Sequence, residues 1–487
     1  MRGLWVTLAL ALAAIGAAFV VLEGARSGVA ISQTQVGSTP VTVFETQAKG
    51  PAVVIAHGFA GSRQMMQGYA LSLARAGYRV LAFDFEGHGR HPVPMSGDVD
   101  AIEGTTRLLV EQTLEVVAAA QSDGPVALLG HSMATDILIR AAQTDEHDIG
   151  PLVVISAFSQ VVDEGFPPSM LMITGAWEPG LRAFAREAVQ MVEPSTGEGD
   201  LALSGAVSRK AVVAPLAEHV GVLHSRAGRA EAVAWLNAAY GRDVVPRVPA
   251  TGPWTLVLLV ALVILARPMS RLLPPHPDAQ RPALAGWQVA ALLVVPAAIA
   301  APVAVLVDLQ ALPVLVADHL AVHLGLFGLI QLALLRAFGQ PFGRMSATGL
   351  LAVLIWGLVL FGLALDRYAA NFLPIPERMA IIAILALGAV PFMLADALVT
   401  DGGRASPARR ILARVAFLAS LALAVTLDFQ GLFFLIMIAP VIVLFYALFG
   451  LVGRWVAQRQ GALASGLGLG LCLAWALGVS FPMFAAG

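Results

Sequence analysis

The sequence predicts an α/β domain with a mostly parallel sheet, followed by an all-α polytopic membrane domain. Three observations support this prediction. The chain has 487 residues, of which 58% are hydrophobic and only 13% are charged, whereas a soluble domain carries about 25% charged residues. Short runs of Val, Ile and Leu alternate with helical patterns over residues 30–245. Long uncharged runs recur from residue 248 onward.

The composition excludes several classes of protein. The formal net charge is -2 and there is no block of basic residues, so nothing attracts the chain electrostatically to nucleic acid. The only cysteine is Cys472, so the chain can form neither an internal disulfide nor a cysteine metal site. Arginine outnumbers lysine and alanine is abundant, which is typical of proteins from GC-rich bacteria.

The first hydrophobic run predicts a membrane anchor. Leu4–Leu22 is uncharged and long enough to cross a hydrocarbon core of about 30 Å as a helix. The small residues 16–18 also fit a cleaved signal peptide, but the apolar run is longer than the core of a usual signal. We therefore expect an uncleaved anchor over residues 1–24, the α/β domain over 25–247 and the membrane domain over 248–487.

The C-terminal region predicts about eight transmembrane helices, since most of its uncharged runs reach the roughly 20 residues that a span needs. The runs are Val248–Ala266, Pro282–Val307, Leu320–Leu335, Ser346–Leu365, Met379–Ala395, Ile411–Leu427, Phe429–Gly453 and Ala462–Met483. Arginines concentrate in alternate loops, which by the positive-inside rule puts the N-terminus in the cytoplasm. We therefore expect a bacterial inner-membrane protein whose α/β domain lies outside the cytoplasm.

The hydrophobic pattern of the α/β domain alternates between strand and helix periods. Continuous apolar runs predict parallel strands that are buried on both faces, namely VTVFET, AVVIAHG, YRVLAFDF, VALLG, LVVISAF, MLMITG and KAVVAP. The expected helices are Gln64–Ala76, Thr105–Gln121, Met133–Gln143, Pro179–Met191 and Ala227–Tyr240.

A polar interruption separates one strand-like run from the helix-like run that follows it. In VALLGHSMATDILIRAA, Ser132 ends the interruption, with Gly130 two positions before it and Ala134 two positions after it. A nucleophile elbow needs such small flanking residues, and its usual pattern is G-x-S-x-G, from which Ala134 departs by one methyl group. Two more turns also follow strands, HGFAGS from His57 and FDFEGHGR from Phe83.

Together these motifs resemble the α/β-hydrolase superfamily over about 215 residues, and the chain order Ser…Glu…His matches that family. The resemblance implies an α/β-hydrolase domain with Ser132 as nucleophile, His219 as general base and Glu178 as the carboxylate that orients it. The backbone N–H groups of Phe59 and Met133 would form the oxyanion hole. The triad implies neither a metal nor an organic cofactor.

Several of these assignments have alternatives. Ser132 could instead be a helix N-cap, His224 could be the base, and Asp163 or Glu164 could supply the carboxylate. The other histidines of the motif turns are expected to be structural hydrogen-bonding groups, namely His57, His88 and His131. Arg90 stands where many relatives have serine, and the sequence predicts no consequence of it.

The predicted spans contain few polar residues. His319 and His323 share one helix face and follow Asp318, and ionisable groups inside a membrane are functional candidates. Two histidines at this spacing can bind a metal, but no third ligand is evident, so we expect interfacial residues that face the bundle or the α/β domain. Arg414 interrupts one apolar run, and Asp396 has no assigned role.

The segment SQVVDEGFPPSM leaves no room for the large cap that many relatives insert between LVVISAF and MLMITG. We expect the membrane bundle or the membrane surface to replace the cap, so that the site meets lipid-borne substrates.

The sequence therefore predicts a membrane-integral esterase, lipase or thioesterase that acts on an acylated lipophilic small molecule or lipid. An acyltransferase is an alternative because it would use the same triad and acyl-enzyme. A third possibility is a lipid transport or binding protein with a hydrolase-like accessory domain. The scarcity of charges within the spans argues against an ion-coupled transporter.

Overall fold

The computed structural model describes residues 2–48, 50–98, 102–121, 124–144, 147–307 and 309–485. The chain forms two compact units. The α/β unit comprises residues 17–257, 366–371 and 482–487, and the helical unit comprises residues 1–16, 258–365 and 372–481.

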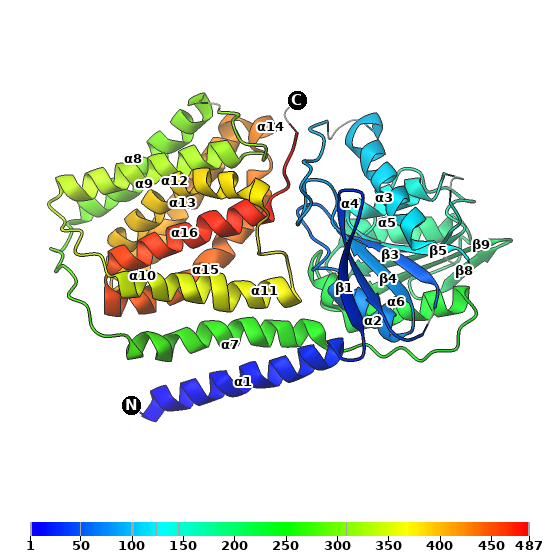
Figure 1. Cartoon of the computed structure of the whole chain (residues 1–487). Helices are drawn as coiled ribbons and strands as arrows, with labels where there is room; N and C mark the ends of the chain where they lie inside the picture. The colour runs from blue at the N-terminus through cyan, green and yellow to red at the C-terminus, as the bar shows by residue number, and fades with distance from the viewer. Residues whose placement is uncertain are drawn as a thin grey trace. The chain divides into compact units, whose positions relative to one another are not determined.

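The α/β unit is built on a nine-stranded sheet with the order β1-β2-β4-β3-β5-β6-β7-β9-β8 (Figure 1). The strands are β1 Ala30–Val36, β2 Thr39–Glu45, β3 Ala52–Ala56, β4 Arg79–Phe83, β5 Val126–His131, β6 Ile149–Ile155, β7 Ser169–Gly175, β8 Leu201–Ser204 and β9 Val207–Ala214. The central strands from β4 to β9 pair in parallel, whereas β1, β2 and β8 join antiparallel. The predicted mostly parallel sheet is therefore confirmed.

Helices cover both faces of this sheet, as predicted. They are α2 Gln67–Arg75, α3 Arg107–Ala120, α4 Met133–Ala141, α5 Pro179–Gln190 and α6 Arg226–Ala239, with shorter helical turns η1 Ile102–Thr106 and η2 Gly221–His224. Alternate strand residues such as Val53, Ile55, Leu171 and Ile173 form one buried cluster with α2 and α6, because successive strand side chains point to opposite faces. Residues 156–168, all described, contain no helix or strand, so this connection carries no cap.

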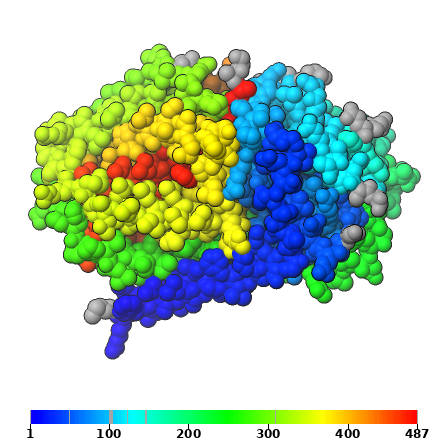
Figure 2. All heavy atoms as spheres, in the orientation of Figure 1, coloured from blue at the N-terminus to red at the C-terminus, as the bar shows by residue number. Residues whose placement is uncertain are grey.

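The sequence did not predict β1 and β8, the two edge strands. Most residues of β1 are exposed, and its sequence AISQTQV is largely polar. It lies at the surface of the α/β unit, among the residues coloured dark blue in Figure 2. An edge strand has only one neighbour and little burial, so the continuous apolar signal of the central strands is missing.

Two segments from far along the sequence complete the α/β unit. The first segment begins at residue 482, near the C-terminus, and pairs with Met95. The Met95 N–H donates to the Met483 carbonyl (2.9 Å), and the Ala485 N–H donates to the Met95 carbonyl (2.7 Å). These bonds surround a parallel bridge between Met95 and Phe484. The second segment, residues 366–371, is hydrogen-bonded to Ser62 and Arg90 in the turns that follow β3 and β4.

The helical unit consists mainly of long apolar helices, with two short helical segments, η4 and α14, between them. They are α8 Gly286–Val307, α9 Ala317–Ala337, α10 Ala347–Leu354 with η3 Ile355–Phe361, α12 Pro376–Val399, η4 Asp401–Gly403, α13 Pro407–Leu427, α14 Phe429–Leu432, α15 Leu435–Gln460 and α16 Ala462–Ser480. Three helices contribute residues to both units, α1 Arg2–Arg26, α7 Thr251–Leu272 and α11 Gly362–Tyr368. Among the described residues, nine helical segments have the length and composition of membrane spans, which fits the predicted polytopic domain.

Candidate active site

Ser132 occupies a sharp strand-to-helix corner. β5 ends at His131 and α4 begins at Met133, and Ser132 between them has φ 53° and ψ −120°. A positive φ is costly for a residue with a side chain, and hydrogen bonding holds it here, because the Ser132 N–H donates to the Ile155 carbonyl at 2.9 Å. Its hydroxyl does not cap α4, which removes the N-cap alternative.

The small residues around Ser132 are required by close packing. A Cβ atom at Gly130 would lie 2.6 Å from Leu138 Cδ1 and 3.1 Å from Ala134 Cβ. Alanine at position 134 is therefore tolerated only because it faces a glycine. A Cβ at Gly58 would lie 3.0 Å from Ser132 Cβ, so the HGFAGS turn passes directly beside the elbow.

His219 lies within hydrogen-bond distance of both other predicted site residues. Its Nε2 is 2.9 Å from Ser132 Oγ, and its Nδ1 is 2.6 Å from Glu178 Oε1. His219 comes from the loop after β9, and its side chain is 45% exposed, against 5% for Glu178. The rival His224 lies in η2, where burial lowers its pKa. The imidazole at Ser132 is thus that of His219 and is open to solvent.

Glu178 lies between the end of β7 and the first turn of α5, where Pro179 follows it. Its Oε2 accepts hydrogen bonds from Ser156 Oγ at 2.7 Å and from the Gly175 N–H at 2.6 Å. Burial alone would raise the pKa of Glu178, but the bonds from His219, Ser156 and Gly175 together lower it. Glu178 is therefore held as an anion beside the imidazole.

The two rival carboxylates lie elsewhere. Asp163 Oδ1 accepts from the N–H groups of Gly165 and Phe166, both at 2.8 Å, and so closes a turn. Glu164 is exposed. Neither carboxylate makes a hydrogen bond to His219 among the described residues.

Ser156 is a site residue that the sequence analysis missed. It follows β6 directly and has φ 52°, and its N–H donates to the Ile173 carbonyl at 2.7 Å. This conformation aims its hydroxyl at Glu178. The only signal in the sequence was a serine after LVVI, at the sheet edge where Ser132 also lies.

The two histidines of the motif turns next to the site are buried and structural. His131 Nε2 donates to the His219 carbonyl at 2.8 Å, which fixes the loop that carries His219. Burial lowers the pKa of His131 to about 4. His57 Nδ1 donates to the Gly58 carbonyl at 2.8 Å, and its Nε2 accepts from the Phe85 N–H at 3.1 Å. Burial also lowers the pKa of His57, so both rings are neutral.

The buried His131 predicts a pH-dependent stability. The unfolded chain binds a proton at His131 below pH ~6.5, whereas the folded chain does so only near pH 4. The contribution of His131 to the free energy of unfolding is therefore fully present above pH ~6.5. It decreases by about 3 kcal/mol as the pH falls from ~6.5 toward 4. Denaturant unfolding of the full chain in detergent should show this slope, and His131→Gln should flatten it. The partly exposed His147→Gln is the control, and an unchanged slope in His131→Gln would contradict the prediction.

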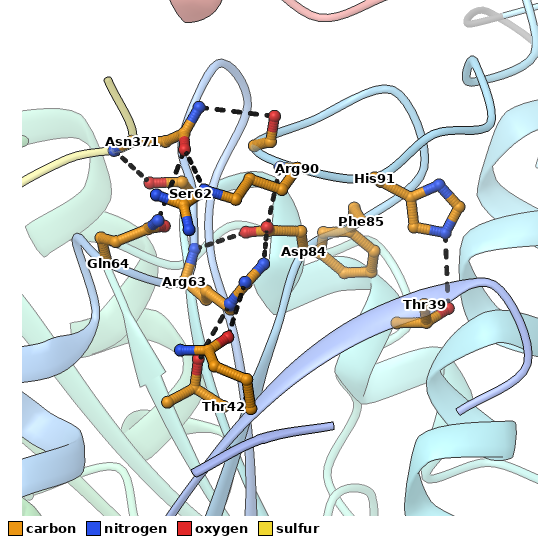
Figure 3. A network of polar contacts seen from close by, with 12 residues as sticks. Thr39, Thr42, Ser62, Arg63, Gln64, Asp84, Phe85, Arg90, His91 and Asn371 are labelled. Carbon is orange, nitrogen blue, oxygen red and sulfur yellow. Dashed lines mark hydrogen bonds and ion pairs between the residues drawn. The ribbon is translucent and has the colours of Figure 1, made fainter. Parts of the chain in front are cut away.

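A network of polar contacts attaches Asn371 to the turns that follow β3 and β4 (Figure 3). Asp84, which follows β4, accepts from the N–H groups of Arg63 (2.8 Å) and Arg90 (2.9 Å) and pairs with the Arg63 guanidinium. The Arg90 guanidinium binds both carboxylate oxygens of Asp366, at 2.7 and 2.6 Å, and Asn371 Oδ1 at 3.0 Å. Arg90 thus has a structural role that the sequence did not reveal.

The polar residues of α9 are mostly bound to protein groups. Asp318 Oδ2 accepts from the backbone N–H groups of residues 311 and 312. His323 Nε2 is 2.9 Å from Ser420 Oγ, and its ring centroid is 5.5 Å from that of His319. Within the described ranges, no group of three His, Cys, Asp or Glu side chains could hold a metal.

Part of the α/β unit matches a known protein family. Residues 47–224 match the family model described as serine aminopeptidase, S33. The chain is 30% identical over 113 residues to a Variovorax paradoxus protein named as a candidate carbamate hydrolase, covering 23% of this chain and 40% of that protein. It is 27% identical over 116 residues to a protein phosphatase methylesterase of Bos taurus, covering 23% and 29%. It thus spans two fifths or less of these curated relatives.

Solved structures give similar matches. An epoxide hydrolase of Vigna radiata is 23% identical with a TM-score of 0.23, over 27% of this chain and 39% of that chain. A serine hydrolase involved in carbazole degradation is 15% identical with a TM-score of 0.33, over 43% of this chain and 99% of that chain. The family match, the sheet order and the corner at Ser132 together show that the N-terminal region has the α/β-hydrolase fold. The helical unit lies outside the matched residues.

Proposed function

We propose that the chain is a membrane-integral serine hydrolase that cleaves an acyl ester or thioester of a lipophilic substrate. The observation that supports it most is the chain of hydrogen bonds from Ser132 through His219 to Glu178. Ser132 Oγ lies 2.9 Å from His219 Nε2, and His219 Nδ1 lies 2.6 Å from Glu178 Oε1. A serine hydroxyl is a poor nucleophile until a neighbouring base takes its proton. The His219 imidazole would be that base.

In the proposed reaction, Ser132 Oγ attacks the acyl carbon while its proton moves to His219 Nε2. Collapse of the tetrahedral intermediate breaks the bond to the alcohol or thiol, which leaves with the proton from His219. Water then attacks the acyl-enzyme by the same route and releases the carboxylic acid. Glu178 stabilises the imidazolium that forms in each half-reaction and fixes the Nδ1–H tautomer.

Two backbone N–H groups would stabilise the oxyanion. Met133 is the first residue of α4, so its N–H belongs to the unpaired first turn of a helix and lies at the positive end of the helix dipole. Phe59 follows Gly58, which packs against Ser132. Each oxyanion-hole donor of this kind contributes about 3–4 kcal/mol to transition-state stabilisation.

The surroundings of the site support a lipophilic substrate. Several large apolar side chains within three positions in sequence of Ser156, Glu178 or His219 are exposed: Phe158 (57%), Trp177 (64%), Leu216 (83%) and Val220 (44%). Exposed apolar surface beside a site commonly marks a binding surface for apolar partners. An acyl chain or the apolar region of a membrane could cover them. The exposure of His219 favours hydrolysis over acyl transfer, because water can reach the base.

The arginine distribution supports an extracytoplasmic position for this domain. If the N-terminus is cytoplasmic, the arginine-rich loops of the helical unit share its side, and α1 carries the α/β unit across the membrane. The proposed location is the inner membrane of a bacterium, with Ser132 outside the cytoplasm.

Labelling with a fluorophosphonate probe tests the proposed chemistry. Membranes that contain the full chain should become labelled, with the adduct on the peptide that carries Ser132, because the probe reacts only with an activated serine. Ser132→Ala should lose at least about 99% of the labelling, given the 10³-fold or larger losses typical of such substitutions. Ser225→Ala, which removes the N-cap of α6, is the control and should still label. Equal labelling of the Ser132 variant would refute the proposed nucleophile.

A further inference from the structure

The helical unit contains a cavity, lined partly by arginines, that takes no part in the chemistry at Ser132. It has a volume of about 320 Å³ and lies among residues of α12, α13, α15 and α16. Its lining includes three arginines, Arg410, Arg414 and Arg454, but only one carboxylate, that of Asp396. The lining therefore carries an excess of positive charge.

The cavity lies at one end of these helices. Asp396 is in the last turn of α12, and Arg410 is in the first turn of α13. Arg454 is in the last two turns of α15, and Ser465 is in the first turn of α16. Ends of apolar spans lie where the hydrocarbon core meets the polar headgroups. The cavity is therefore at the depth of lipid headgroups.

The protein itself neutralises only part of this charge. Arg414 Nη2 is 3.4 Å from Asp396 Oδ2, and the Arg414 guanidinium carbon lies 4.8 Å above the Tyr446 ring. Arg410 and Arg454 form no ion pair with any residue that the structure describes. The Nε atoms of all three arginines are buried and have no hydrogen-bond partner among the described residues.

Three partly buried guanidinium groups beside one carboxylate would attract an anion. Burying charged donors without partners costs free energy that a bound anion would offset. Arginine is the side chain best suited to phosphate, because its planar fork can donate two parallel hydrogen bonds to two oxygens. Basic pockets between membrane helices commonly receive lipid headgroups.

Glycines lie against two of the arginine side chains, and one of these glycines is required by close packing. Gly403 has φ 77°, and a Cβ there would lie 2.3 Å from Arg454 Cγ. A Cβ at Gly450 would lie 3.8 Å from Arg414 Nη2, so a larger side chain would intrude on the guanidinium. The aliphatic stem of Arg454 is therefore packed closely against Gly403.

We propose that this cavity binds the phosphate group of a phosphate ester, with Arg410, Arg414 and Arg454 as its ligands. Apolar side chains such as Leu451 and Leu469 line the same cavity, so an amphiphile with a phosphate headgroup fits better than a free ion. This inference does not depend on the function proposed for Ser132.

Binding of a short-chain lipid tests the proposal. The full chain, carrying Ser132→Ala so that no probe is consumed, is purified in a nonionic detergent and titrated with dioctanoyl phosphatidic acid. Dioctanoyl glycerol, which lacks only the phosphate, is the matched ligand control, and inorganic phosphate is the competitor. We expect saturable binding of the phosphatidic acid, at least about ten-fold tighter than binding of the glycerol lipid.

Matched variants locate the site. Arg410→Gln and Arg454→Gln should each weaken binding at least about ten-fold, because each removes a charge-assisted donor. Arg409→Gln removes the same charge from the neighbouring position of α13, outside the cavity lining, and should change affinity by less than about two-fold. Arg454→Lys keeps the charge but loses the planar guanidinium group that donates two parallel hydrogen bonds, so it should also weaken binding. This variant tests the site if a glutamine variant fails to fold.

The outcomes separate the possible ligands. Competition by inorganic phosphate at equal affinity would support the phosphate site with a soluble ligand, whereas no competition would support a lipid headgroup. Equal affinity for the two dioctanoyl lipids would overturn the proposal. So would an Arg409→Gln variant that weakens binding as much as Arg410→Gln does.

Discussion

Replacing His219 with alanine should lower kcat/KM for a p-nitrophenyl ester by about 10³–10⁶-fold. Its Nε2 lies 2.9 Å from Ser132 Oγ, and no other imidazole is within hydrogen-bond distance of that hydroxyl among the described residues. Without His219 the hydroxyl keeps its proton and the leaving group receives none. The residual rate would come from the oxyanion hole and from substrate binding alone.

His224→Ala is the matched control for this measurement. The two histidines are close in sequence and both belong to the segment after β9, but His224 packs against Gly252 and its carbonyl accepts from Arg229. Its loss should change kcat/KM by less than about ten-fold, since it affects packing and not proton transfer. If His224→Ala removes as much activity as His219→Ala at equal folded content, the assignment of His219 as the base is wrong.

Replacing Glu178 with glutamine should lower kcat by about 10⁴-fold with little change in KM. The amide has nearly the same shape, but it can donate to His219 Nδ1, which leaves the proton on Nε2. The imidazole then cannot accept the proton of Ser132. The bonds that Ser156 and Gly175 donate to Glu178 would also turn toward the amide oxygen and reinforce this orientation.

Glu164→Gln makes the same chemical change at an exposed carboxylate that the sequence offered as an alternative. It should leave kcat within about two-fold, because surface substitutions rarely propagate. A pH profile of kcat for both variants, with the folded fraction measured in parallel, completes the test. A Glu178→Gln enzyme with near-normal kcat would mean that another group orients His219.

Much of the α/β unit could be predicted because its central strands are buried on both faces. Such strands appear in the sequence as continuous apolar runs, and the parallel sheet brings their carboxyl ends to one edge. Ser132, Glu178 and His219 each follow a strand, β5, β7 and β9. This placement, together with the resemblance to the α/β-hydrolase superfamily, suggested three side chains that the structure brings within hydrogen-bond distance.

The features that escaped prediction depend on contacts with no local pattern. Ser156 looks like any serine after a strand, and only its φ of 52° reveals that its hydroxyl is aimed at Glu178. The partners of Arg90 lie far along the chain, Asp366 276 positions later and Asn371 281 positions later. A sequence pattern reports the neighbours of a residue along the chain and not its partners in space.

Because the α/β unit is assembled from three stretches of chain, no single excised piece reproduces it. A soluble fragment that stops near residue 257 would leave the Arg90 guanidinium without Asp366 and Asn371. It would also lack residues 483–485, whose backbone pairs with Met95. Weak activity from such a truncation would therefore report damage at the cut edges rather than the capacity of the intact enzyme.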